Sequence, residues 1–152
     1  GGGLDIAFLG FGEFDEEGSV NVSRLGGVTV GPGGFIDIAQ NAKKVVFCGT
    51  LAAKGVRLQT GDGQMRVLQQ GAVKKLVKQV DQITFSGPQG LVRQQEVLYL
   101  TERASFRLTP QGVEVFEIAP GIDLQRDVLD QMDFRPRVAK DLKVMDSAHF
   151  RA

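Results

Sequence analysis

The sequence has very little of the residues that build disulfides and transition-metal sites. Its 152 residues contain one cysteine, Cys48, one histidine and no tryptophan. A single cysteine cannot form an internal disulfide, which favours a reduced, cytoplasmic setting. One cysteine and one histidine are also too few ligands for a zinc site. Because Cys48 lies in the apolar run 45–48, we expect it to be buried as a small hydrophobic residue.

Neither sign of charge is in excess, and long hydrophobic runs are missing. Lysine and arginine total 18, as do aspartate and glutamate, so the formal net charge is zero. Sequence-independent nucleic-acid binding needs clustered positive charge, so the balance argues against that partner. No apolar run approaches the roughly 20 residues that cross a bilayer, which argues against a membrane span. The chain does not begin with methionine and leads directly into a strand-like segment, so we expect it to be part of a longer protein.

Glycine, in contrast, is abundant and separates short apolar runs throughout the chain. There are 20 glycines, which is typical of turns between buried elements. The apolar patterns predict strands at 4–10, 43–50, 81–86 and 95–101, hairpins at 14–22, 55–70 and 104–118, a strand, turn and short helix within 28–42, and helices at 73–80 and 122–132. Asp123 is the predicted N-cap of the last helix. This order predicts an α/β fold in one domain, 1–152, with a mostly parallel central sheet flanked by helices and with inserted β-hairpins.

A glycine-rich turn, 31–34, carries the most specific local pattern. It lies between a predicted strand and a predicted helix, where glycines let a ligand approach the backbone and helical N–H groups favour an anion. A phosphate, a carboxylate or an oxyanion would suit such a site, and a tight turn without any ligand fits the same residues equally well. The dinucleotide pattern GxGxxG is broken by Ile36, and no P-loop lysine follows.

Two further residues are considered for the site, a lysine, Lys54, and the single histidine, His149. Lys54 follows the predicted strand 43–50, at the edge where α/β sheets bind ligands, so it is a candidate for a phosphate or carbonyl oxygen. A solvated loop lysine is the alternative interpretation. His149 lies three residues from the end, where we expect no catalytic role. The segment 73–80 is predicted to be an amphipathic helix with a solvated lysine face.

Several segments resemble, in order, the C-terminal, β-type half of family I coenzyme A (CoA) transferases. The turn GPGGFID, 31–37, resembles the GxGGxxD turn of that half. Further similar segments are the opening 2–10, the hairpin 14–22, the stretch 50–55 and the closing element 98–121, so that the resemblance covers about residues 1–138. Within the family the chain looks most like the short-chain acyl-CoA:acetate or 3-oxoacid transferases. The resemblance implies the CoA-transferase/NagB-like open α/β fold.

The resemblance also implies an activity. Such enzymes move CoA between a short-chain acyl-CoA and a carboxylic acid, such as acetate or a 3-oxoacid, through a glutamyl-CoA thioester. CoA and acyl-CoA are then substrates, and no permanently bound cofactor is expected. In the family the nucleophilic glutamate belongs to a Glu-x-Gly motif upstream of the opening segment, and this sequence has no such motif at a matching position. We therefore expect the glutamate to lie N-terminal to Gly1 and the chain alone to be inactive.

The resemblance assigns site residues and partners as well. Residues expected on the CoA or oxyanion side of the site are Gly31, Gly33, Gly34, Phe35, Lys54 and Asn21, with no metal ligand among them. Asp37 is expected to cap or orient the helix that follows the turn. The expected partners are the N-terminal half of the same enzyme and further copies in a homo-oligomer of the full enzyme. We therefore expect an exposed apolar face where the other half docks.

Two other interpretations come from different functional classes. A non-enzymatic phosphosugar- or metabolite-sensing domain would use a related α/β architecture, because fold does not determine function. It predicts that the chain alone binds a phosphosugar. An NAD-binding redox domain is the weaker interpretation, because the sequence lacks GxGxxG.

Overall fold

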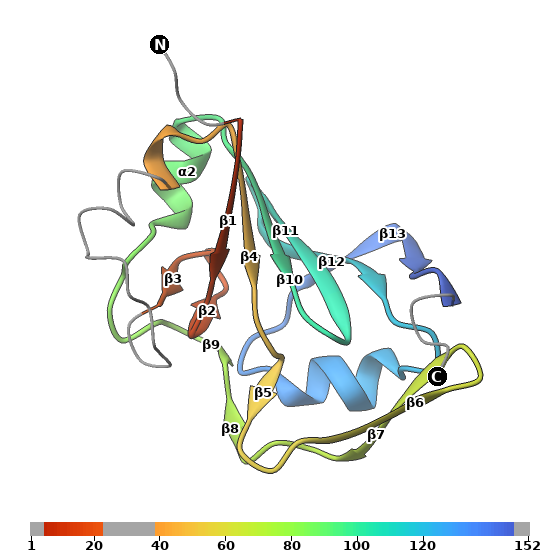
Figure 1. Ribbon diagram of the computed structural model, residues 1–152. Coiled ribbons are helices and arrows are strands. Elements are labelled where there is room, and N and C mark those ends of the chain that lie inside the picture. The colour runs from red at the N-terminus through yellow and green to blue at the C-terminus, as the bar shows by residue number, and fades with distance from the viewer. Residues whose placement is uncertain (1–4, 23–38, 148–152) are drawn as a thin grey trace.

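The main feature of the fold is a six-stranded mixed sheet. The computed structural model describes residues 5–22 and 39–147 (Figure 1). The sheet order is β1-β4-β10-β11-β12-β13, formed by β1 (Ile6–Gly10), β4 (Lys44–Cys48), β10 (Glu96–Leu100), β11 (Ala104–Thr109), β12 (Gly112–Ile118) and β13 (Arg137–Val144). The pairs β1–β4, β4–β10 and β12–β13 are parallel, whereas β10–β11 and β11–β12 are antiparallel. The predicted α/β class is confirmed, with a mixed sheet.

Seven short strands form smaller sheets beside the main one. They are β2 (Glu13–Asp15), β3 (Val20–Asn21), β5 (Ala52–Ala53), β6 (Arg57–Gly61), β7 (Gln64–Gln69), β8 (Val73–Lys74) and β9 (Leu76–Val77). The pairs β2–β3, β6–β7 and β5–β8 are antiparallel, and β9 runs parallel to β2. The hairpins predicted at 14–22, 55–70 and 104–118 are therefore confirmed.

Helices are few and short in the described part of the chain. Residues 39–41 are helical, α2 spans Gly87–Val92, and a π-helical turn, η1 (Leu124–Val128), continues into a 3₁₀ turn, η2 (Leu129–Gln131). The Asp123 side chain accepts the Arg126 backbone N–H at 2.8 Å, which confirms the predicted cap of the last helical segment. A broad layer of helices flanking the sheet stays a prediction. None of the helices in 5–22 and 39–147 has the length and apolar character of a membrane span.

The helix predicted at 73–80 is wrong. This segment forms the two short strands β8 and β9, because its backbone pairs with β5 and with β2. Lys75 and Leu76 are buried while Val73 is exposed, so the burial pattern does not follow the helical spacing. Pairing with strands distant in the sequence has overridden the local apolar pattern.

Two further predictions are corrected. The predicted strand 81–86 contributes only one isolated bridge, Val20 to Phe85, and leads into α2, which the sequence pattern did not reveal. Cys48 is exposed rather than buried. It ends β4 on the sheet face that the core does not cover, whereas Val45 and Phe47 point into the core. A run of apolar residues does not show which of them lie on the uncovered face.

The core lies on one face of the sheet and is centred on Phe14. This ring is fully buried and stacks on Tyr99 with centroids 4.5 Å apart. It also contacts the rings of Phe11, Phe106 and Phe134. The Tyr99 hydroxyl donates a 2.6 Å hydrogen bond to the Gly18 carbonyl, and burial raises the pKa of Tyr99 well above its ordinary value. Aromatic packing therefore fixes the β2–β3 hairpin against β10 and β11.

Replacing Phe14 by alanine should destabilise the fold strongly. Loss of a buried phenylalanine side chain costs about 3–5 kcal/mol of the free energy of unfolding. Urea unfolding followed by circular dichroism measures this change. Phe8→Ala is the matched control, because Phe8 is 69% exposed. Equal losses in the two variants would contradict the central role of Phe14 in the core.

Candidate functional site

Most of the residues predicted for the site lie outside the described residues. These are Gly31, Gly33, Gly34 and Phe35. Asp37, predicted to cap or orient a helix, and His149, for which no catalytic role was expected, also lie outside the described residues. Asn21 and Lys54 are described, and their proposed contact with CoA stays a prediction. Asn21 is buried on β3, and its side-chain amide donates to Glu13 Oε2 at 3.1 Å. Lys54 is exposed just after β5 with a positive φ of 61°, and its carbonyl accepts the Ala72 N–H at 2.8 Å.

The described residues place a different group of polar side chains at the carboxyl edge of the sheet. The parallel strands β1, β4 and β10 end in register, with Gly10 beside Cys48 and Cys48 beside Leu100. α/β sheets bind ligands at this edge, outside the carboxyl ends of the strands. We call the polar side chains that gather here the carboxyl-edge cluster, which consists of Thr50, Gln70, Lys75, Glu102, Arg103 and Asp127.

Arg103 is the centre of one half of this cluster. Its side chain is completely buried. Its Nε donates to Glu102 Oε2 at 2.9 Å, and its Nη1 donates to the Asp127 carbonyl at 2.9 Å and to Gln70 Oε1. Its Nη2 is buried without a hydrogen-bond partner among the described residues. The guanidinium therefore ties the β10–β11 connection to the end of β7 and to η1.

Asp127 completes this half of the cluster. Burial by itself would raise its pKa, but hydrogen bonds from Arg126, from the Asp123 N–H and from Gln70 lower the pKa overall. The carboxylate accepts the Gln70 side-chain amide at 3.0 Å and the Asp123 backbone N–H at 3.0 Å. Asp127 is therefore ionised at neutral pH, and each of its carboxylate oxygens accepts a hydrogen bond within the fold.

The other half of the cluster is formed by Lys75, Thr50 and Glu102. The Lys75 Nζ donates to Thr50 Oγ1 at 3.0 Å and lies 4.9 Å from the centre of the Phe11 ring. Burial lowers the pKa of Lys75, and the negative charge of Glu102 partly offsets this by raising it. Glu102 Oε1 accepts the Leu51 N–H at 2.9 Å, so the carboxylate is fixed between that amide and Arg103.

Part of this cluster was recognisable from the sequence and part was not. Glu102 and Arg103 directly follow the predicted strand 95–101. The rule that selected Lys54, position after the carboxyl end of a strand, would have selected them as well. Lys75 was missed because the segment 73–80 was predicted to be a helix with its lysines in solvent.

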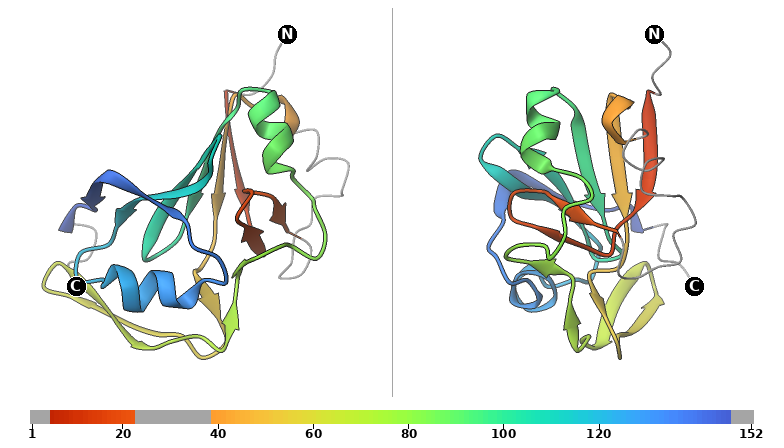
Figure 2. Two further views of the ribbon diagram at one scale, coloured as in Figure 1. Left: turned by 180° about the vertical axis from the view of Figure 1, so that it is seen from behind. Right: turned by 90° about the vertical axis from the view of Figure 1, so that its left-hand side faces the viewer.

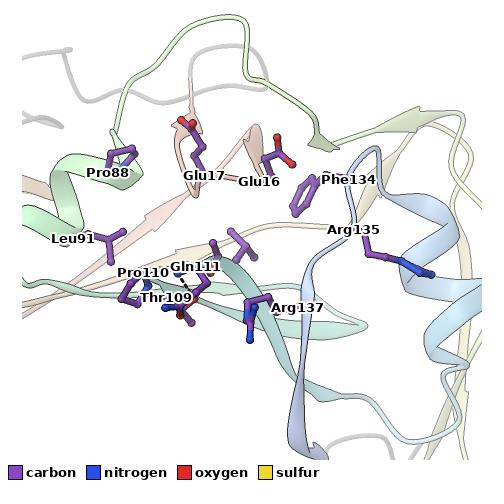
Figure 3. A pocket seen from close by; sticks show the side chains of 12 residues that line it. Glu16, Glu17, Pro88, Leu91, Thr109, Pro110, Gln111, Phe134, Arg135 and Arg137 are labelled. Carbon is purple, nitrogen blue, oxygen red and sulfur yellow. Dashed lines mark hydrogen bonds between the residues drawn. The ribbon is translucent and has the colours of Figure 1, made fainter.

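A separate cleft lies at the other end of β10 and β11 (Figure 3). It has a volume of about 440 Å³ and is bounded by the β2–β3 turn, the start of α2, the β11–β12 turn and the segment 134–137. Glu16 and Glu17 lie across the cleft from Thr109 and Arg137. Glu16 pairs with Lys78 at 3.6 Å, and Arg137 lies 3.9 Å from Glu114. Two of the charged side chains that line the cleft, Glu16 and Arg137, thus have partners elsewhere, and the cleft is distinct from the carboxyl-edge cluster.

No family model matches the sequence. The chain is 47% identical over 150 residues to the acetate CoA-transferase YdiF of Escherichia coli K12 and 50% identical over 155 residues to the caffeate CoA-transferase of Acetobacterium woodii. Each alignment covers 99% of this chain, but only 28% and 29%, respectively, of the relative.

The structural comparison agrees with the sequence comparison. A crystal structure of the acyl-CoA transferase YdiF of Escherichia coli O157:H7, a thioester complex with CoA, matches with a TM-score of 0.90 and 47% identity. The match covers 98% of this chain and 29% of that one. The resemblance predicted from the sequence is therefore confirmed: over nearly its whole length the chain is related to the CoA-transferases and spans somewhat more than a quarter of their polypeptide.

Proposed function

We propose that this chain is the C-terminal part of an acyl-CoA:carboxylate CoA-transferase. The full enzyme would move CoA between a short-chain acyl-CoA and a carboxylic acid, acetate or a 3-oxoacid, in the cytoplasm. The observation that carries this proposal is the identity of about one half to two CoA-transferases across almost the entire chain. The acyl-CoA is a substrate in this proposal, and the full enzyme would act as a homo-oligomer.

In the proposed reaction a glutamate outside residues 1–152 carries the covalent steps. Its carboxylate attacks the acyl-CoA carbonyl, the C–S bond breaks, and CoA leaves as the thiolate, so that an acyl-glutamyl mixed anhydride remains on the enzyme. The thiolate then attacks the glutamyl carbonyl and displaces the acyl group as a carboxylate, which leaves a glutamyl-CoA thioester. An acceptor carboxylate runs the same steps in reverse. Each tetrahedral intermediate places negative charge on an oxygen, so preorganised donors are required.

The proposed contribution of this chain is binding and stabilisation of charge. The backbone of the turn formed by Gly31, Gly33, Gly34 and Phe35 is the proposed donor group for CoA or the oxyanion. Lys54 and Asn21 are proposed as further contacts on the CoA side. Support comes from the position of Lys54 after β5, beyond the carboxyl end of β4.

An open apolar face supports the proposal that the rest of the enzyme packs on this chain. On β1, Ile6 is 45% and Phe8 is 69% exposed, and both lie on the face opposite the core residue Ala7. The register puts Phe8 beside Val46, and Val46 beside Leu98. β2, β3 and α2 cover the other face, as the right-hand view of Figure 2 shows. An exposed apolar patch of this kind marks an interaction surface, and the relatives contain more than three times as much chain.

Intact-protein mass spectrometry after incubation with acetyl-CoA tests the proposed activity. In the full-length enzyme, the polypeptide that carries the glutamate should gain the mass of one CoA less one water. Residues 1–152 alone should show no mass change, because the nucleophile is absent.

The control for this experiment is a phosphosugar in place of acetyl-CoA. If the full-length enzyme forms no CoA adduct and residues 1–152 alone bind the phosphosugar, the sensor-domain interpretation replaces the transferase.

Phe8→Lys should weaken association with the remainder of the enzyme. Burial of a phenylalanine side chain contributes about 1.5–3 kcal/mol, so the dissociation constant should rise by about ten- to a hundredfold. Isothermal titration of residues 1–152 with the separately expressed remainder measures it. Leu58→Lys on the β6–β7 hairpin is the matched control, because Leu58 is an exposed apolar residue outside this face. Equal binding by the two variants would show that the sheet face is not the docking surface.

A further inference from the structure

We infer that Lys75, held in place by Thr50, forms a binding site for a carboxylate group during CoA transfer. The inference rests on the proposed function and adds to it a site at the carboxyl edge. Two carboxylates take part in the proposed reaction, that of the acceptor acid and that of the nucleophilic glutamate. Both present the same chemistry to an ammonium group.

The site is assembled from segments that are distant in the sequence. Thr50 follows β4, Phe11 follows β1, and Lys75 lies between β8 and β9. Glu102 follows β10, the third of the parallel strands. All of these segments meet where β1, β4 and β10 end in register, which is the part of an α/β sheet that binds ligands.

The Lys75 ammonium has hydrogen-bond donors left for a ligand. Its ammonium carries three donors. In the described part of the chain, it makes one hydrogen bond, to Thr50 Oγ1, and one contact with the Phe11 ring. The Thr50 hydroxyl donates to the Ala52 carbonyl at 3.0 Å, so its oxygen accepts from Lys75. Two donors of the ammonium remain for a ligand.

Lys75 also lacks an ion-pair partner among the described residues, in contrast to three other lysines of the chain. Lys44, Lys74 and Lys78 each pair with a carboxylate, at 3.6, 3.3 and 3.6 Å. These three lysines keep between one third and about seven tenths of their side chains exposed. Lys75 is only 6% exposed and forms no such pair. A buried cation without a counter-charge is costly, so a bound anion would stabilise it.

Glu102 cannot supply that counter-charge by a small rotation. One of its oxygens accepts the Leu51 N–H and the other accepts Arg103 Nε, both at 2.9 Å. The Arg103 guanidinium already neutralises this carboxylate. Glu102 therefore raises the pKa of Lys75 against the effect of burial, without pairing with it. The ammonium stays available for a carboxylate that arrives from outside the described residues.

The full-length enzyme carrying Lys75→Met tests the inference. Methionine keeps an unbranched side chain of similar length and removes only the charge and the donors. We expect a loss of about tenfold or more in a step that binds a carboxylate, because a hydrogen bond to a charged group contributes about 1.5–3 kcal/mol. The measurements are KM for the acceptor acid, KM for acyl-CoA, and the single-turnover rate of enzyme–CoA thioester formation with acyl-CoA alone.

Three further variants serve as controls. Lys78→Met removes a neighbouring lysine whose side chain is 72% exposed, and its kinetic constants should stay within about twofold of the wild type. Lys75→Arg, which restores the charge, should recover part of the loss. Thr50→Val changes an exposed residue and removes the acceptor of the Lys75 hydrogen bond. It should therefore impair the same step even if Lys75→Met does not fold.

KM for the acid and the rate of thioester formation distinguish the acceptor acid from the nucleophilic glutamate as the bound carboxylate. A raised KM for the acid with unchanged thioester formation assigns the site to the acceptor acid. Slower thioester formation with unchanged KM for the acid assigns it to the nucleophilic glutamate. If folded Lys75→Met, or Thr50→Val in its place, leaves both quantities unchanged, the inference is overturned while the proposed function stands. If the wild-type enzyme forms no CoA thioester, the proposed function fails and the inference fails with it.

Discussion

The arrangement of the carboxyl edge depends on one buried guanidinium. Arg103 contacts Glu102, Gln70 and the Asp127 carbonyl, and so joins the β10–β11 connection to the end of β7 and to η1. A buried charge is tolerated only when it is paired and hydrogen-bonded, and removal of one partner costs about 3–5 kcal/mol. Because Glu102 in turn accepts the Leu51 N–H, the loop after β4 takes its position from the same network.

The network also explains why Lys75 differs from its neighbours. The Glu102 carboxylate is bound to Arg103 and to a backbone amide, so it forms no ion pair with Lys75, although its negative charge raises the pKa of that lysine against the effect of burial. Phe11 and Thr50 then hold the ammonium from two other loops. Lys75 is thus buried and held without an ion-pair partner among the described residues, whereas Lys44, Lys74 and Lys78 are more exposed and each pair with a carboxylate.

The two faces of the sheet have different roles in the fold. On the inner face, Phe14 and Tyr99 attach the β2–β3 hairpin to the sheet through a stacked pair and through the hydrogen bond to Gly18. The outer face keeps Phe8 and Cys48 exposed. Such an exposed apolar surface fits the proposal that further polypeptide packs on this face.

Much of the local structure followed from the sequence. Short apolar runs and glycine turns predicted β1, β4, β10 and the hairpins, because in these segments the tertiary structure agrees with the local preference for strands. Asp123 was recognised as a cap, since a side-chain oxygen before a helical turn satisfies a nearby backbone N–H. The family resemblance was also contained in the order of short segments, and it did not require the fold.

Tertiary structure decided the rest. The segment 73–80 has helical spacing, yet pairing with β5 and β2 made it two strands and buried Lys75. Cys48 lies in an apolar run, yet it is exposed, because the elements that pack on β4 cover only one of its faces. Of the cluster, the sequence marks Glu102 and Arg103 by their position after a strand, whereas their contacts with Gln70 and Asp127 cross 33 and 24 residues. Local pattern predicts most of the strands and hairpins. Burial and long-range pairing decide which side chains meet, because burial and pairing depend on the fold of the whole chain.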